Sequence, residues 1–222
     1  LAKSEFVSFV AHELKNPMTS IKGYSELLAA GSVGQINEMQ SNFLSTIRAN
    51  VQRMSALVSD LNDNAKIEAG QLRLDYKPVS VDDVVDEVIR STKRQVEEKK
   101  QIIELHVPQE LPTVWADQMR VGQVLTNLVS NAHKYTPEGG KILLGAEVTS
   151  NQWDPSGAKE VVHLWVKDNG IGMAAEHVKM LFNLRMWNAG QETTKEKGTG
   201  LGLVLCKELL EKSGGSISAE SE

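Results

Sequence analysis

The sequence has little cysteine and no long apolar run, and each shortage excludes a class of protein. Its 222 residues include a single cysteine, Cys206, so no internal disulfide can form, which is typical of a reducing compartment. No run of roughly 18 apolar residues is present, so the sequence predicts no membrane-spanning helix. We therefore expect a cytoplasmic location, with membrane attachment only through segments outside this chain.

Positive charge is also scarce. The chain has 24 Lys and Arg against 29 Asp and Glu, a net charge of -5, and the basic residues are scattered along it. This balance argues against a nucleic-acid partner or an anionic membrane surface. Aromatic residues make up 5% of the chain, whereas 41% of residues are hydrophobic and 24% charged, which is ordinary for a folded protein large enough for one or two domains.

Residues 1–70 carry the spacing of paired helices. In two segments, 1–30 and about 38–68, apolar residues recur at alternating steps of three and four, and a turn-rich stretch, 31–37, joins them. A hairpin alone buries little of such a face, so we predict a homodimer in which two hairpins form a four-helix bundle. The apolar positions are Phe6, Val10, Leu14, Pro17, Ile21, Tyr24 and Leu28, then Leu44, Ile47, Val51, Met54, Val58 and Leu61.

A histidine stands off this apolar stripe. At about 100° per residue, His12 lies roughly 200° from Val10 and so faces solvent, with Glu13 beside it and Asn16 one turn further. Pro17 removes one helical hydrogen bond and is expected to kink the helix just after the histidine. A lone surface histidine is most often only solvated, but this combination also suits a reactive site.

Residues 71–222 mix helices and strands without a regular βαβ alternation. This pattern predicts a second domain, a two-layer α/β sandwich with a mixed sheet. Ser80 and Asp117 are expected to cap two of its helices. We expect strands at 72–76, 101–107, 114–116, 141–148, 161–167 and from 216, and helices at 81–98, 118–135, shortly after 173, and 199–212.

Three stretches of this domain carry candidate chemistry. Asn127, Asn131 and Lys134 share one helix face, where two amide oxygens suit Mg²⁺ and a lysine suits phosphate, although a solvated polar face has the same pattern. Asp168-Asn169-Gly170-Ile171-Gly172 follows a strand. A buried carboxylate there would accept a hydrogen bond from the exocyclic amine of adenine, favouring ATP over GTP, whereas the alternative is an ordinary turn.

The third stretch is Gly198-Thr199-Gly200-Leu201-Gly202, directly before an amphipathic helix. Glycines at a helix N-terminus present backbone N–H groups to an anion such as a triphosphate. It lacks the ending of a Walker A loop, and the polar segment 183–197 before it is predicted to be a mobile lid. Each motif alone is ambiguous, whereas their order along the chain is far more specific.

In this order the motifs resemble those of the sensor histidine kinases. His12 to Pro17 resembles the phosphoacceptor box of that family, Asn127 to Tyr135 its asparagine box, and Asp168 to Gly172 and Gly198 to Gly202 its two glycine boxes. The resemblance covers nearly the whole chain. It implies a dimerisation and histidine-phosphotransfer hairpin over 1–70 and an ATP-binding domain over 71–222, shared with gyrase and mismatch-repair ATPases and expected to lack its last strand here.

The resemblance also implies roles for residues. His12 would attack the γ-phosphate of ATP, Glu13 would take a proton from the ring or orient it, and Asn16 would position water for dephosphorylation of a response regulator. That regulator would accept phosphate on an aspartate of its receiver domain. The residues implied in ATP binding are Asn127, Asn131, Lys134, Tyr135, Asp168, Gly170, Gly172, Gly198, Thr199, Gly200, Leu201 and Gly202, of which Asn127 and Asn131 would also hold Mg²⁺.

Two other functions remain open at this point. A silent signalling scaffold would dimerise and bind nucleotide without transferring phosphate. A chaperone-like or DNA-topology ATPase would share the ATP pocket but would have no use for His12 on a hairpin.

Overall fold

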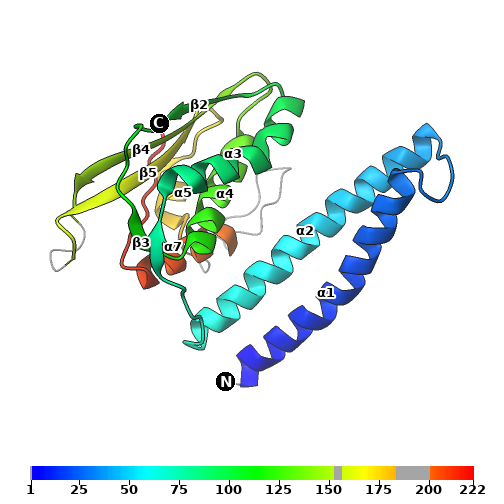
Figure 1. The fold of residues 1–222 in the computed structure, drawn as a ribbon, viewed down its shortest axis with the longest axis horizontal. Helices are drawn as coiled ribbons and strands as arrows, with labels where there is room; N and C mark the ends of the chain where they lie inside the picture. Colours follow the sequence, from blue (N-terminus) through cyan, green and yellow to red (C-terminus); the bar gives the residue numbers. More distant parts are fainter. Residues whose placement is uncertain (1, 153–156, 184–200) are drawn as a thin grey trace. The chain divides into compact units, whose positions relative to one another are not determined.

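The computed structural model describes residues 2–152, 157–183 and 201–222. Its contacts divide the chain into two compact units, Leu1–Leu72 and Arg73–Glu222. The first unit is a helical hairpin, and the second combines helices with two small sheets (Figure 1). In the part of the chain that is described, no helix is long and apolar enough to cross a membrane.

The hairpin consists of α1 (Ala2–Ala29) and α2 (Glu38–Glu68), joined by the turn expected at 31–37. A capping box begins α2: the Asn37 side chain accepts from the Gln40 N–H, and the Gln40 side chain accepts from the Asn37 N–H, each at 2.8 Å. Gly70, at a φ of +67°, follows the end of α2, a conformation that glycine adopts without a steric penalty.

The apolar residues of the hairpin separate into two kinds of row. An inner row spaced by seven residues is buried between the helices: Ser4, Ala11, Met18 and Ser25 on α1, and Leu44, Val51 and Ala65 on α2. An outer row remains 39–47% exposed: Leu14, Ile21 and Leu28 on α1, and Ile47, Met54 and Leu61 on α2. The sequence predicted one wide apolar face, of which a single hairpin buries little. The structure divides that face, since small side chains such as Ser4, Ala11 and Ser25 allow close helix packing and the larger ones remain outside.

Both outer rows lie on the same face of the hairpin. In each helix the outer row is turned about 50° backwards from the inner row, as a seven-residue repeat requires. Because the two helices run antiparallel, the same sense of rotation brings both rows to one side. His12 follows Ala11 of the inner row by one residue, so it is turned the opposite way and lies on the other face.

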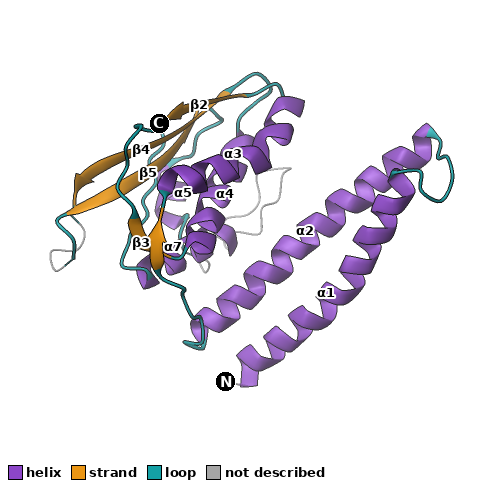
Figure 2. Ribbon diagram, viewed as in Figure 1, coloured by secondary structure: helices purple, strands orange, loops and turns teal. Residues whose placement is uncertain are grey.

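The second unit packs helices on one side of a mixed sheet (Figure 2). In the three-stranded sheet, β4 lies between β2, which is parallel to it, and β5, which is antiparallel. A separate antiparallel pair joins β1 to β3. This arrangement confirms the predicted fold class. The elements are β1 (Lys77–Val79), α3 (Val81–Glu98), β2 (Ile102–His106), β3 (Val114–Ala116), α4 (Gln118–Tyr135), β4 (Lys141–Ser150), β5 (Glu160–Asp168), α5 (Ala175–Met180) and α7 (Leu201–Lys212).

The core of this unit lies between α3, α4 and the inner face of β4. Leu125 and Val129 of α4 meet Leu144 of β4, and all three are almost fully buried. Val84 and Val88 bring the apolar face of α3 to the same cluster. This packing holds α4, the helix that carries both candidate asparagines, firmly against the sheet.

The strands predicted at 72–76 and from 216 are absent from the structure. Residues 71–76 form no strand, and the strand begins at Lys77 and includes Pro78, which pairs with Trp115. Proline is tolerated there because β1 has one partner only and an edge strand can spare an N–H donor. Residues 216–219 are irregular as well, because no strand pairs with them within the described chain.

Candidate functional site

His12 lies on the outer surface of α1, as the sequence predicted. Its side chain is 72% exposed, and its Nδ1 lies 3.4 Å from a carboxylate oxygen of Glu13, which is also exposed. Asn16 is exposed one turn further along. The imidazole therefore has one nitrogen facing a carboxylate, while the other is free to meet a partner from solvent.

Helix α1 continues through Pro17, although proline cannot donate a backbone hydrogen bond. Pro17 has no N–H, so the carbonyl of Glu13, the residue directly after the histidine, loses its helical partner. Two residues on, the Thr19 hydroxyl donates to the carbonyl of Lys15 at 2.8 Å, a contact often found where helices bend.

In the second unit, Asn127 and Asn131 lie against the beginning of α7. The Asn131 amide donates to the Asn127 Oδ1 at 3.1 Å, and both side chains are half-buried instead of solvated. A Cβ on Gly202 would lie 2.3 Å from the Asn127 Nδ2, so a larger residue here would displace the asparagine side chain or α7. Gly202, the last residue of the second glycine motif, thus lies against Asn127.

The first glycine motif is tied to the C-terminal end of the same helix α4. The Ile171 N–H donates to the Tyr135 carbonyl at 3.3 Å, and a Cβ on Gly170 would lie 2.6 Å from that oxygen. Asp168 accepts from the Gly170 N–H at 2.8 Å. The structure corrects one expectation: Asp168 is exposed instead of buried, because it lies at the very end of β5.

Gly172, at a φ of +64°, touches the last residues of the chain. A Cβ on Gly172 would lie 2.8 Å from the Glu222 carbonyl, and the neighbouring Met173 N–H donates to the Ser221 hydroxyl at 2.8 Å. Both conditions, the positive φ and the close approach, require glycine at this position.

Lys134 and Tyr135 form a local pair at the end of α4. The Lys134 ammonium lies 4.6 Å from the centre of the Tyr135 ring and donates to its hydroxyl at 3.1 Å. Lys134 thus presents an ammonium group, which attracts phosphate, in the last turn of the helix that carries the asparagines.

Sequence reasoning missed the residues that hold the C-terminal end of α4. The buried Gln101 amide donates to the carbonyls of His133, Thr136 and Pro137 at 3.0, 2.7 and 3.3 Å, and its Oε1 contacts the His133 Nδ1 at 2.7 Å. The Lys99 ammonium donates to the His133 carbonyl at 2.9 Å. These contacts join residues more than 30 positions apart, so no local pattern could have revealed them.

Two glycines, Gly170 and Gly202, thus lie against α4, which carries the Asn127–Asn131 pair, and Asp168 contacts Gly170. Mg²⁺ is a hard cation that prefers oxygen ligands, and the two asparagine side chains on this helix face offer amide oxygens of that kind. Several predicted residues lie outside the described part of the chain: Gly198, Thr199, Gly200 and all of the predicted lid, 183–197, except Asn183. The side chain of Leu201 is not described either.

Comparison with known proteins identifies both units. Residues 2–70 match the family described as the His Kinase A (phospho-acceptor) domain, and residues 116–222 match the histidine kinase-, DNA gyrase B-, and HSP90-like ATPase family. The chain is 34% identical over 221 residues to the non-motile and phage-resistance protein of Caulobacter vibrioides, and 34% identical over 228 residues to the cell-division control histidine kinase PdhS of Brucella abortus. Each match covers 99% of this chain but only 26% and 21% of the relatives' lengths.

Solved structures agree with these matches. Full-length ShkA in complex with AMPPNP superposes with a TM-score of 0.69 at 25% identity, over 98% of this chain and 44% of that one. The Acinetobacter baumannii histidine kinase AdeS gives 0.58 at 28% identity, over 90% and 86%. The two family matches, these relatives and these structures show that the chain belongs to the sensor histidine kinases and matches the catalytic core of that family.

Proposed function

We propose that this chain transfers the γ-phosphoryl group of ATP to His12 and then to an aspartate on the receiver domain of a response regulator. Residues 1–70 act as the dimerisation and phosphotransfer domain, and residues 71–222 bind ATP. The observation that carries the proposal is the exposed His12 imidazole with the Glu13 carboxylate 3.4 Å from one ring nitrogen.

The attack uses the ring nitrogen that does not face Glu13. The lone pair on the His12 Nε2 forms the new N–P bond, while the bond from phosphorus to the bridging oxygen of ADP breaks. Glu13 accepts the Nδ1 proton, so the ring remains neutral as the bond forms. Asn16, one turn along the same surface, is placed to position a water that hydrolyses the phosphorylated aspartate of the regulator.

The residues around α4 hold the nucleotide. Asn127 and Asn131 would hold Mg²⁺ through their amide oxygens, and the ion would neutralise phosphate charge. Lys134 adds a positive charge, Tyr135 lines the end of the helix, and Asp168 accepts a hydrogen bond from the adenine amine, which GTP lacks. Backbone N–H groups near Gly202, at the start of α7, face the phosphates.

The exposed outer rows support a homodimer. Together with Phe6, Tyr24 and Phe43 they leave on the order of 800 Å² of apolar surface on one face of the hairpin, about what each partner contributes to a standard interface. Pairing through this face leaves His12 accessible, because His12 lies on the opposite side.

Incubation with γ-labelled ATP and Mg²⁺ tests the proposal. We expect label on the protein that is stable in base and labile in acid, absent from His12→Gln, and transferable to a receiver domain. Tight ATP binding without label would indicate a silent scaffold instead. Steady ATP hydrolysis unaffected by His12→Gln would indicate an ATPase of the gyrase or chaperone type.

A further inference from the structure

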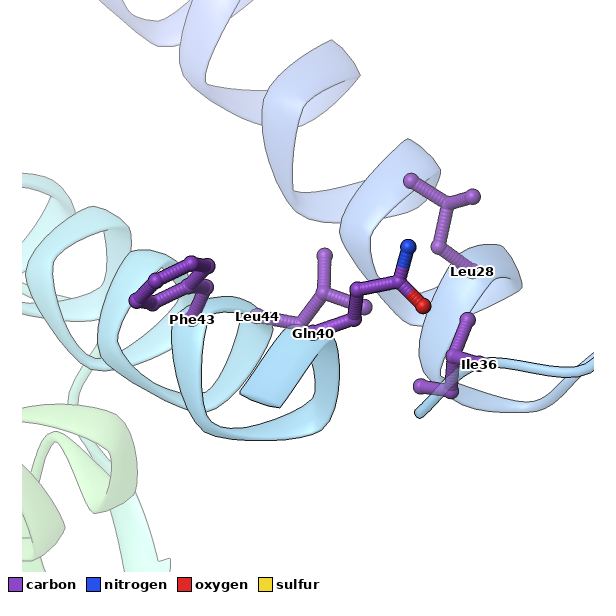
Figure 3. A pocket seen from close by; sticks show the side chains of 5 residues that line it. All are labelled: Leu28, Ile36, Gln40, Phe43 and Leu44. Atoms are coloured by element: carbon purple, nitrogen blue, oxygen red, sulfur yellow. The ribbon is translucent and has the colours of Figure 1, made fainter. Parts of the chain in front are cut away.

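An apolar pocket of about 210 Å³ lies at the turn end of the hairpin (Figure 3). Leu28 of α1 and Ile36 of the turn form one side, and Gln40, Phe43 and Leu44 of α2 form the rest. Figure 3 shows the Gln40 amide directed toward Leu28 and Ile36, with the Phe43 ring beyond it along α2. The volume is enough for one aromatic side chain.

The pocket is continuous with the outer rows. Leu28 is the last outer-row residue of α1, and Gln40 precedes Ile47 of the α2 outer row by seven residues, so the pocket opens on the same face. Phe43, on its rim, keeps 61% of its surface exposed. The Phe43 ring and the open pocket both expose apolar surface to water, which is unfavourable in free energy. Insertion of an aromatic ring into the pocket would bury both surfaces.

We infer that Phe43 of a second copy of this chain occupies the pocket, and that the insertion is reciprocal. The inference rests on the proposed homodimer. In a two-fold bundle of parallel hairpins the two turn ends meet, so the pocket of each copy lies beside Phe43 of the other. Each ring then packs on Leu28 of the other copy, and the two rings lie next to one another as an aromatic pair. Phe43 thus acts as the anchor of the dimer at this end.

The first test is the dissociation constant of the dimer, measured by sedimentation of the whole chain. Phe43→Ala is expected to weaken association on the order of 30-fold for each lost anchor. Phe9→Ala is the matched control, because Phe9 is 62% exposed on the same hairpin but faces the His12 side, and it should leave the constant unchanged. Equal constants for Phe43→Ala and the unmodified chain would overturn the inference, and would mean that another segment or protein fills the pocket.

A mixing experiment separates insertion across the dimer from packing within one chain. Phe43→Ala keeps Leu28 and the other residues that line the pocket, and Leu28→Ala keeps Phe43. A mixed dimer of the two therefore retains one complete anchor, and should form on the order of 30-fold more tightly than the Phe43→Ala homodimer. No gain on mixing would overturn the inference while leaving the kinase proposal intact. A chain that is monomeric without any substitution would instead contradict the proposed homodimer.

Discussion

The chemistry proposed for His12 depends on one neighbouring carboxylate, which can be tested alone. Glu13→Gln keeps the size of the side chain but removes its ability to accept a proton. We expect the rate of phosphorylation to fall by about 10²–10⁴-fold, with ATP affinity unchanged. The measurement is label incorporation in single turnover, and Glu26→Gln, two heptads from His12 on the same face of α1, is the control. An unchanged rate would mean that the Nδ1 proton leaves by another route.

Gly202 is the residue at which a single methyl group should damage the nucleotide site. In Gly202→Ala the new Cβ would meet the Asn127 amide at 2.3 Å, so α7 or the asparagine must move. A displacement of about 1 Å corresponds to about a 100-fold loss in kcat/KM for ATP. Gly122→Ala in α4 is the control, because its Cβ would meet Val84 at an ordinary 4.0 Å. Equal kcat/KM values for the two variants would argue against a site at this contact.

For single residues, the sequence was informative where the position of a residue along its helix determines which side it faces. The exposure of His12, for example, follows from its angle to Val10. Asp168 was misjudged, because strand periodicity says which face a residue takes but not whether anything covers the end of the strand.

Among the elements, α4 depends on a buried amide from outside the helix. Gln101→Glu removes the N–H donations to His133 in the last turn of α4 and to Thr136 and Pro137 just after it, and adds negative charge at the negative end of the helix dipole. We expect a loss of about 1–3 kcal/mol in unfolding free energy and faster hydrogen exchange at the end of α4. Gln95→Glu, on the exposed side of α3, should change neither. Unaltered exchange in Gln101→Glu would show that the Lys99 contacts suffice.

In α2, burial, and to a lesser extent the nearby Asp63 carboxylate, raise the pKa of Asp60 to about 6. The folded chain therefore binds this proton more tightly than the unfolded chain, whose pKa is near 3.8. Its stabilising effect is complete below about pH 4 and is lost as pH rises through about 6.

Asp60→Asn should abolish this pH dependence. We expect the variant to exceed the unmodified chain in stability above pH 6, by on the order of 1 kcal/mol once solvent screening of a half-exposed group is allowed for, with the difference vanishing near pH 4. Urea midpoints at fixed protein concentration measure it, and the exposed Glu26→Gln should show no such trend. A difference that is constant with pH would assign the effect to packing.

The elements themselves were predictable where capping chemistry marks their ends. The helices after Ser80 and Asp117 begin where expected, with Asp83 and Arg120 N–H groups donating to the caps. The strands at 72–76 and 216–219 were wrong, because alternation over five residues cannot tell whether a partner strand lies alongside.

For the whole molecule, the heptad spacing predicted a paired hairpin but could not distinguish the inner row from the outer row. A seven-residue repeat fixes angles around each helix and says nothing about which neighbour a row meets. Only the structure shows that the small residues Ser4, Ala11 and Ser25 face α2 within the chain, whereas Leu14 and Ile21 remain exposed.

This division gives a direct test of the dimer face. Ile21→Glu places a charge in the middle of the outer row of α1, where pairing would bury it, so we expect the dimer to dissociate at least about 100-fold more readily. Thr19→Glu adds the same charge two residues away, on the exposed side that carries His12, and should leave association unchanged. Sedimentation of both variants measures the effect. If Ile21→Glu remained as tightly dimeric as Thr19→Glu, the copies would have to meet through another face, and the accessibility of His12 in the dimer would lose its explanation.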